Sequence, residues 1–83
     1  MRTVVIEAKA ARVLRKMPTN TARLIRQKID QYAADPESLS ANVVKLTERR
    51  GYRLRVGDWR VLFDEDGVVL TIFQIGSRGQ VYR

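Results

Sequence analysis

The stretch from residue 52 to residue 75 restricts the fold of this chain more than any other part of it. Apolar and polar side chains alternate there, which is typical of strands that bury one face. Two turn sequences interrupt the alternation: Gly57-Asp58 is a two-residue link, and residues 64–67 end in a glycine that can adopt a positive φ. Short turns join antiparallel neighbours, so the pattern predicts a three-stranded meander. Its expected strands are residues 52–56, 59–63 and 68–75, the last of them central.

The first half of the chain predicts a strand followed by two helices. Residues 2–6 are rich in β-branched side chains, and residues 7–16 place apolar residues at helical spacing until Pro18 ends the helix. The candidate N-caps of the second helix are Thr19, Asn20 and Thr21. Its apolar face consists of Ala22, Ile25, Ile29 and Tyr32. Asp35-Pro36 ends it, and two helices with so short a link pack as an antiparallel hairpin.

Together these elements predict an α+β fold in the order β-α-α-β-β-β, with the helical hairpin covering one face of an antiparallel sheet. Residues 37–41 are expected to form a loop, and residues 43–46 form either a short strand or a turn. Residues 76–79 are expected to end the last strand, after which Val81 and Tyr82 either add a strand or close the chain. The length of 83 residues indicates one domain, spanning residues 1–83.

The composition excludes several kinds of site. The chain has no cysteine and no histidine, which removes disulfides, thiolate metal sites and the commonest metal ligand and general base. Turn chemistry explains the acids at residues 64–66, so no metal or other cofactor is expected. No apolar run reaches the roughly 20 residues of a membrane span, and we expect a cytoplasmic protein without membrane contact. The net charge of +7 favours polyanionic partners or acidic protein surfaces.

Arginines occupy many polar positions of the predicted sheet, so one short segment can build an apolar face and a cationic face. If Arg53 and Arg55 were the only basic residues in this region, a solvent-exposed sheet face would be the favoured explanation for them. However, residues 45–60 hold six basic and two acidic side chains, which favours contact with RNA. The candidate RNA-binding residues are Lys45, Arg49, Arg50, Arg53 and Arg55.

Several segments resemble, in this order and spacing, the RelE/ParE superfamily of bacterial type II toxins. They are Lys45-Leu46, residues 51–63, residues 75–78 and residues 81–83. The resemblance covers nearly the whole chain and implies a toxin that a cognate antitoxin holds inactive. RelE-like members cleave mRNA in the ribosomal A site, whereas ParE-like members share the fold, inhibit DNA gyrase and lack the nuclease residues.

Resemblance to the RelE branch implies a catalytic set of Arg60, Arg78 and Tyr82. The two arginines match residues that contact the scissile phosphate, and Tyr82 matches a tyrosine that stacks on the substrate nucleotide or acts on it. From the residues alone, other roles are open for each of them. Arg60 could pair with Asp58 or with an acid of the 64–66 turn, Arg78 could be a loop charge, and Tyr82 could anchor the tail.

Two departures from the RelE pattern keep the ParE branch open. Arg53 matches a position where RelE toxins often carry a lysine, but Gly51 stands where they commonly carry a second one. Arg49, Arg50 and Lys45 are the candidates that could replace its charge. The chain also ends at Arg83, where many relatives continue into a C-terminal helix that the antitoxin can displace. The alternative function is therefore a ParE-like gyrase inhibitor without nuclease activity. A general basic RNA-binding module is a third hypothesis.

RNA can be cleaved by attack of its own 2′-OH on the neighbouring phosphorus, without a metal or a protein nucleophile. The reaction needs in-line geometry, a proton acceptor, charge stabilisation and a proton donor for the leaving oxygen. Arginine stabilises the charge because it stays protonated and presents a planar fork of donors. Tyr82 is the candidate base, since neighbouring cations favour its phenolate, and Lys45 is a better acid than any arginine. The expected partners are the cognate antitoxin, the 70S ribosome and its mRNA, with DNA reached only through the antitoxin.

Overall fold

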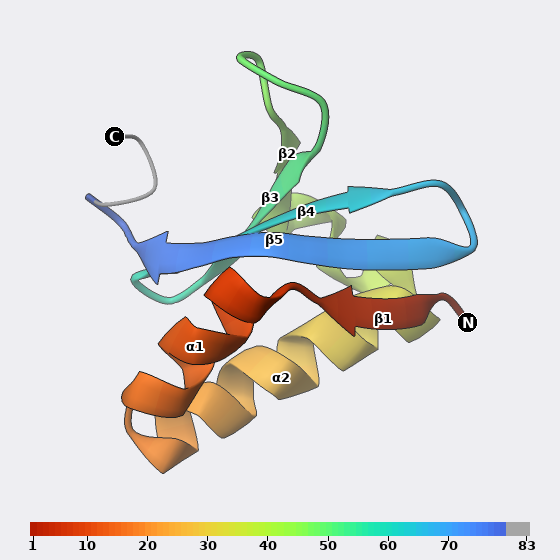
Figure 1. Ribbon diagram of the computed structural model, residues 1–83. Helices are drawn as coiled ribbons and strands as arrows, with labels where there is room; N and C mark the ends of the chain where they lie inside the picture. Colours follow the sequence, from red (N-terminus) through yellow and green to blue (C-terminus); the bar gives the residue numbers. More distant parts are fainter. Residues whose placement is uncertain (80–83) are drawn as a thin grey trace.

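The computed structural model describes residues 1–79, which form two layers: a five-stranded sheet and a pair of helices packed on one of its faces (Figure 1). The strands lie in the order β1-β5-β4-β3-β2. The elements in chain order are β1 (Thr3–Ile6), α1 (Ala8–Lys16), α2 (Thr19–Ala34), the 3₁₀ helix η1 (Pro36–Asn42), β2 (Val43–Lys45), β3 (Tyr52–Val56), β4 (Trp59–Glu65) and β5 (Val69–Ser77). The α+β architecture predicted from the sequence is confirmed.

The strands β3, β4 and β5 form the predicted antiparallel meander. Both expected turns contain a glycine in the left-handed region, with φ of 58° at Gly57 and 93° at Gly67. β5 continues to Ser77, past the predicted end, because Gly76 still pairs with Arg60 across the ladder. A glycine has no side chain to continue an alternating pattern, but its backbone extends the sheet. β5 is an interior strand, and the middle position belongs to β4.

The other two strands extend the meander at its two edges. The sequence left residues 43–46 open between a strand and a turn. Val43–Lys45 pairs antiparallel with β3 and is therefore a strand. β1 pairs with β5 in parallel, with Val4 opposite Leu70. A helical pair rather than a tight turn follows β1, so the chain is not restricted to an antiparallel neighbour there. The sheet is therefore mixed at one edge instead of wholly antiparallel.

The helices α1 and α2 form the predicted hairpin, and their apolar faces close the core. The buried residues of the helices are Ala10 and Leu14 of α1 and Ile25, Ile29, Tyr32 and Ala33 of α2. Phe63 of β4, which is 1% exposed, lies between the layers, with its ring centroid 4.9 Å from that of Tyr32 and 5.5 Å from that of Tyr52. No helix within residues 1–79 is long and apolar enough to cross a membrane.

Two local expectations are corrected. Pro18 occupies the N-cap position of α2 with φ of −54°, and its ring has no side-chain acceptor, so no N-cap hydrogen bond forms. Within the first turn, Asn20 Oδ1 accepts a hydrogen bond of 2.9 Å from the N–H of Thr21. Residues 37–41, expected as a loop, belong to η1. Leu39 is buried there, and this anchor holds the segment against the core.

Candidate nucleic-acid interface

The pleat of β3 and β4 separates the apolar residues from the arginines. Leu54 and Val56 lie in the core, so Arg53 and Arg55, which alternate with them, lie on the opposite side of the sheet. Arg60 alternates with buried Val61 in the same way on β4. We call the side of the sheet turned away from α1 and α2 the open face (Figure 1), and we call Arg53, Arg55 and Arg60 the arginine cluster.

Two members of the arginine cluster are direct cross-strand neighbours. Arg55 pairs with Arg60 in the β3–β4 register, and Arg53 pairs with Leu62, which makes Arg53 the diagonal neighbour of Arg60. Neither Arg55 nor Arg60 forms an ion pair within residues 1–79. Like charges at directly opposed positions destabilise a sheet, so this arrangement has a cost that a bound anion would offset.

The guanidinium of Arg60 is held by main-chain carbonyl groups rather than by an acid. Its Nη1 donates hydrogen bonds to the carbonyl oxygens of Gly57 (2.9 Å) and Trp59 (3.0 Å). Within residues 1–79, Arg60 therefore forms no ion pair with Asp58 or with the acids of the 64–66 turn, which was the alternative role. Both hydrogen bonds come from Nη1. Within residues 1–79, neither of them uses the Nε and Nη2 groups of Arg60, which together form the edge that can bind two oxygens.

Arg78 lies at the same end of the sheet as Arg60. Its backbone N–H donates a hydrogen bond of 2.8 Å to the carbonyl oxygen of Asp58, in the β3–β4 turn. This backbone contact brings the end of β5 next to the β3–β4 turn, which is distant from it in sequence. Tyr82, the third residue of the predicted catalytic set, lies outside the described residues.

The remaining candidates are not part of the arginine cluster. Lys45 pairs with Tyr52, whose ring stacks on Phe63 in the core, so Lys45 belongs to the helix-facing side at the edge of the sheet. Arg49 and Arg50 lie between β2 and β3, where Arg49 contacts Phe73 of β5 and Arg50 contacts Asp64 at the far end of β4 from Arg60. The structure therefore divides the predicted RNA-binding residues among three places.

Arg49 and Arg50 border a groove of about 710 Å³, which we call the mixed-charge groove. Its acidic lining residues are Glu7, Asp64, Glu65 and Asp66, and its basic ones are Lys9, Arg49 and Arg50. Arg50 Nε lies 3.4 Å from Asp64 Oδ1, with 78% of the Arg50 side chain and 35% of the Asp64 side chain exposed, so this pair contributes little stability. No member of the arginine cluster lines the groove. The open face thus has a cationic region and a separate region of mixed charge.

Phe73 is the lining residue that sequence reasoning missed. The β4–β5 register is interrupted, with Leu62 opposite Gln74 but Phe63 opposite Ile72, so Phe73 is left over as a bulge. It lines the groove beside Gln74, and the guanidinium carbon of Arg49 lies 3.8 Å from its ring centroid. The available signal was the three-residue spacing between the buried Ile72 and Ile75, which breaks the period of two.

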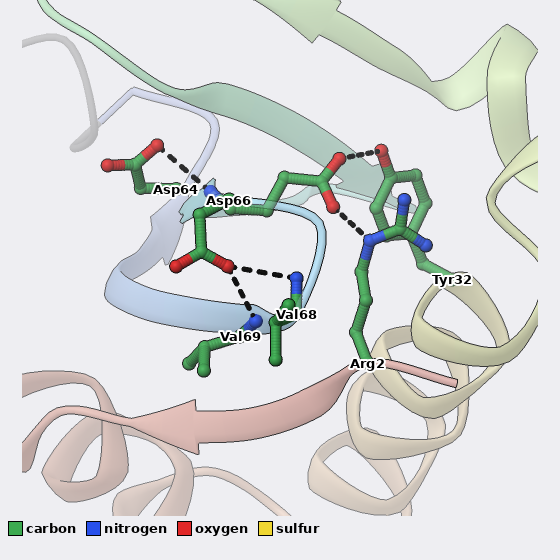
Figure 2. A network of polar contacts seen from close by, with 7 residues as sticks. Arg2, Tyr32, Asp64, Asp66, Val68 and Val69 are labelled. Atoms are coloured by element: carbon green, nitrogen blue, oxygen red, sulfur yellow. Dashed lines mark hydrogen bonds and ion pairs between the residues drawn. The ribbon is translucent and has the colours of Figure 1, made fainter.

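A polar network near the other side of the groove fixes the ends of three elements (Figure 2). Glu65 Oε2 forms an ion pair with Arg2 Nε, and Glu65 Oε1 accepts a hydrogen bond of 3.3 Å from the hydroxyl of Tyr32. The backbone N–H of Arg2 donates to the carbonyl oxygen of Ala33. The network ties the start of β1 and the end of β4 to the C-terminal part of α2.

Two groups in this region have shifted pKa values, and both shifts have structural causes. Burial, and after it the charge of Glu65, raises the pKa of Tyr32 above its ordinary 10.0. Backbone N–H groups of Val69 and Val68 donate to Asp66 Oδ1 at 2.8 and 2.9 Å and lower the pKa of this carboxyl group below its ordinary 3.8 (Figure 2). Asp66 therefore acts as a turn residue, as the sequence indicated for the acids at 64–66.

The helical pair carries most of the net charge of the chain. Within α1 and α2 there are seven basic residues and one acidic residue, which gives +6 of the total of +7. The basic residues are Lys9, Arg12, Arg15, Lys16, Arg23, Arg26 and Lys28. Most of them are exposed, and Leu24 is 45% exposed among them. The outer face of the helices is thus a second cationic surface, on the layer opposite the arginine cluster.

The fold is shared with solved toxins. The RelE–RelB complex of the archaeon Pyrococcus horikoshii OT3 is similar with a TM-score of 0.79 and 25% identity, covering 95% of this chain and 97% of that chain. The intact RelBE toxin–antitoxin complex of E. coli is similar with a TM-score of 0.74 and 17% identity, covering 93% and 96%. The RelB–RelE complex of Methanococcus jannaschii is similar with a TM-score of 0.73 and 17% identity, covering 94% of each chain.

A family model described as the ParE toxin of the type II toxin-antitoxin system parDE matches residues 4–82. The chain belongs to this family of type II toxins, and the resemblance to the RelE/ParE superfamily is confirmed. No curated protein sequence matches the chain. The family assignment replaces the hypothesis of a general RNA-binding module.

Proposed function

We propose that this protein is a toxin that cleaves ribosome-bound mRNA, with the arginine cluster and Arg78 binding the scissile phosphate. The observation that carries the proposal is the direct cross-strand pairing of Arg55 with Arg60. Two guanidinium groups at opposed positions without an acidic partner in residues 1–79 fit a site whose counter-charge comes from the ligand. Guanidinium donors match phosphate oxygens in charge and in geometry.

The proposed reaction is attack of the 2′-oxygen on the adjacent phosphorus. The bond from phosphorus to the 5′-oxygen breaks, which yields a 2′,3′-cyclic phosphate and a 5′-hydroxyl. One proton leaves the 2′-OH, for which Tyr82 is our proposed base, and the 5′-oxygen takes one proton from solvent water. The arginines stabilise the charge that accumulates on the phosphorane. Because Lys45 belongs to the helix-facing side of the sheet, the proposal assigns it no step.

We further propose that a cognate antitoxin covers the outer face of the helical pair with an acidic segment. Three of the similar toxins were solved in complexes with RelB antitoxins. Two cationic surfaces are available to such a partner, the outer face of the helices and the open face of the sheet. The charge of +6 on α1 and α2, together with the exposed Leu24, favours the helices.

A second function, inhibition of DNA gyrase, is favoured by one observation. The matching family model is that of ParE toxins and spans residues 4–82, and the ParE branch acts on gyrase. In this case the protein would bind gyrase as a protein partner, and the arginine cluster would perform no chemistry. The two functions predict opposite results in the same pair of assays.

The test adds purified toxin to translating ribosomes and maps the ends of the message, in parallel with a gyrase supercoiling assay. We expect new ends within A-site codons and unchanged supercoiling. Arg78→Ala should reduce cleavage about 100-fold or more, as removal of one stabilising donor does in other enzymes. Arg26→Ala, an exposed arginine on α2, is the matched control and should cleave like the parent.

Intact message at every codon together with inhibited gyrase would replace the nuclease proposal by the gyrase one. Full activity of both Arg78→Ala and Arg60→Ala would remove the phosphate site from this end of the open face. Circular dichroism of each variant confirms that the fold is kept.

A further inference from the structure

Arg49 lies over the ring of Phe73 on the open face. Its guanidinium carbon is 3.8 Å from the ring centroid, and its Nε donates a hydrogen bond of 3.3 Å to the carbonyl oxygen of Arg50. The aromatic ring thus supports one side of the guanidinium plane, while Arg49 itself is exposed. A planar cation held in this way is a surface on which a nucleobase can stack.

The backbone around this pair is built for close approach. Phe73 reaches the open face as the bulged residue of β5, and Gly51 lies beside its ring. A Cβ atom at Gly51 would lie 3.4 Å from a carbon of that ring and 2.8 Å from the carbonyl oxygen of Phe63. The glycine, with φ of 133°, therefore lets the chain that carries Arg49 lie against the sheet.

The mixed-charge groove around Phe73 fits a base better than a phosphate. A phosphate requires donors and positive charge, whereas the carboxylates of Asp64 and Asp66 line this groove. The edge of a nucleobase carries both donors and acceptors. The groove offers both kinds of group, with the amide of Gln74 and the hydroxyl of Thr71 beside the charged residues.

The distance to the arginine cluster fits one short strand of RNA. Gly76, the cross-strand partner of Arg60, is three residues from Phe73 on β5, which corresponds to about 10 Å along a strand. RNA bound at Arg60 through a phosphate can therefore place a neighbouring base at Arg49.

We propose that Arg49, supported by Phe73, is the stacking platform for an unpaired nucleobase adjacent to the phosphate held by the arginine cluster. The proposal rests on the proposed RNA-cleaving function and makes Arg49 a determinant of substrate selection. Loss of stacking on one base weakens single-strand binding by about tenfold.

The test measures binding, not cleavage. The probe is a short single-stranded RNA with 2′-deoxy residues that block the reaction, in which each base in turn is removed as an abasic site. We expect the parent to lose about tenfold in affinity at one position. In Arg49→Ala this difference between intact and abasic RNA should vanish. Arg12→Ala, on α1, should keep it.

Arg49→Lys separates stacking from charge, because lysine keeps the positive charge but has no planar group. We expect it to behave like Arg49→Ala. The fluorescence of a 2-aminopurine at the sensitive position should change on binding to the parent and not on binding to either variant. Phe73→Leu, which keeps an apolar side chain at the bulge, should reduce this change.

Equal affinity of the parent for intact and abasic RNA would overturn the proposal, as would full base dependence in Arg49→Lys. The proposed function is tested separately. If the protein binds RNA in a base-dependent way but leaves messages on ribosomes intact, the nuclease proposal is rejected and the stacking proposal is kept. If the protein cleaves messages but its binding shows no base dependence, the stacking proposal is rejected and the nuclease proposal is kept.

Discussion

Arg55 of β3 is the direct cross-strand partner of Arg60 of β4, and neither forms an ion pair within residues 1–79. The pair of like charges lowers the stability of the sheet, but it is proposed to bind phosphate. A substitution that removes the repulsion should therefore raise the free energy of unfolding and lower the cleavage activity. The two effects can be measured independently.

Arg55→Glu should therefore stabilise the protein and inactivate it. An opposite-charge cross-strand pair replaces a like-charge one, which should raise the free energy of unfolding by about 0.5–1 kcal/mol. Cleavage should fall about 100-fold or more, because a carboxylate then stands where phosphate is proposed to bind. Urea denaturation and the ribosome assay measure the two effects.

The control for Arg55→Glu is Arg12→Glu, which changes the net charge equally on α1. At saturating toxin concentration it should cleave like the parent. Loss of cleavage in both variants to the same degree would attribute the effect to total charge rather than to the open face.

Glu65→Gln should destabilise the fold without touching the arginine cluster. The carboxylate binds Arg2 and accepts the hydrogen bond of Tyr32, and its side chain is only 15% exposed. Loss of the charge leaves the guanidinium of Arg2 partly buried without its counter-ion, at a cost of about 1–3 kcal/mol. Glu48→Gln, on an exposed residue between β2 and β3, should leave the free energy of unfolding within about 0.5 kcal/mol of the parent's. Equal stability of both variants would contradict a structural role of the network.

Asp66 should make the stability depend on pH in the acid range. Its pKa is lower in the folded protein than the ordinary 3.8, because the N–H groups of Val69 and Val68 bind the ionised form. A depressed folded pKa adds stability above the unfolded pKa, and this contribution is lost as the pH falls through the folded value. Asp66→Asn keeps an accepting oxygen but does not titrate, so its free energy of unfolding should fall less steeply below pH 3.8. Parallel profiles of parent and variant in urea titrations would refute this assignment.

Gly51→Ala should destabilise the protein more than a substitution at Gly57. The new Cβ would lie 2.8 Å from the carbonyl oxygen of Phe63, at a φ of 133° that side chains rarely adopt. Backbone strain of this kind costs about 1–3 kcal/mol. Gly57→Asn is the comparison, because its φ of 58° suits asparagine and no atom lies within 4 Å of its Cβ position. Thermal unfolding of the two variants measures the difference.

The sequence predicted which segments form helices and strands better than it predicted which strands pair with each other. Alternation and glycine turns are local signals, and they located β3, β4 and most of β5. The parallel pairing of β1 with β5 depends on contacts between residues distant in sequence, such as Val4 with Leu70. No local pattern encodes that choice. The 3₁₀ helix η1 was missed for a similar reason, since Leu39 is an anchor only when the core is present.

The positions of the candidate site residues were predictable where they depend only on the alternation of side chains along a strand. Arg53, Arg55 and Arg60 share a face because alternation requires it, and the end of β5 returns Arg78 to the β3–β4 turn. The face of Lys45 depends on its register with Tyr52, which the sequence left open. The contact between Arg49 and Phe73 depends on a bulge, which shifts the phase of the alternation within β5.

The unequal division of charge between the two layers affects how the molecule meets a polyanion. The helices hold +6 of the net charge of +7, whereas recognition of RNA is proposed for the sheet. The protein measures 24 Å along its shortest axis, several times the screening length of about 8 Å in physiological salt. The two cationic surfaces are therefore nearly independent in their fields. A partner that neutralises the helices would lower the net charge of the molecule and leave the field over the arginines of the sheet nearly unchanged.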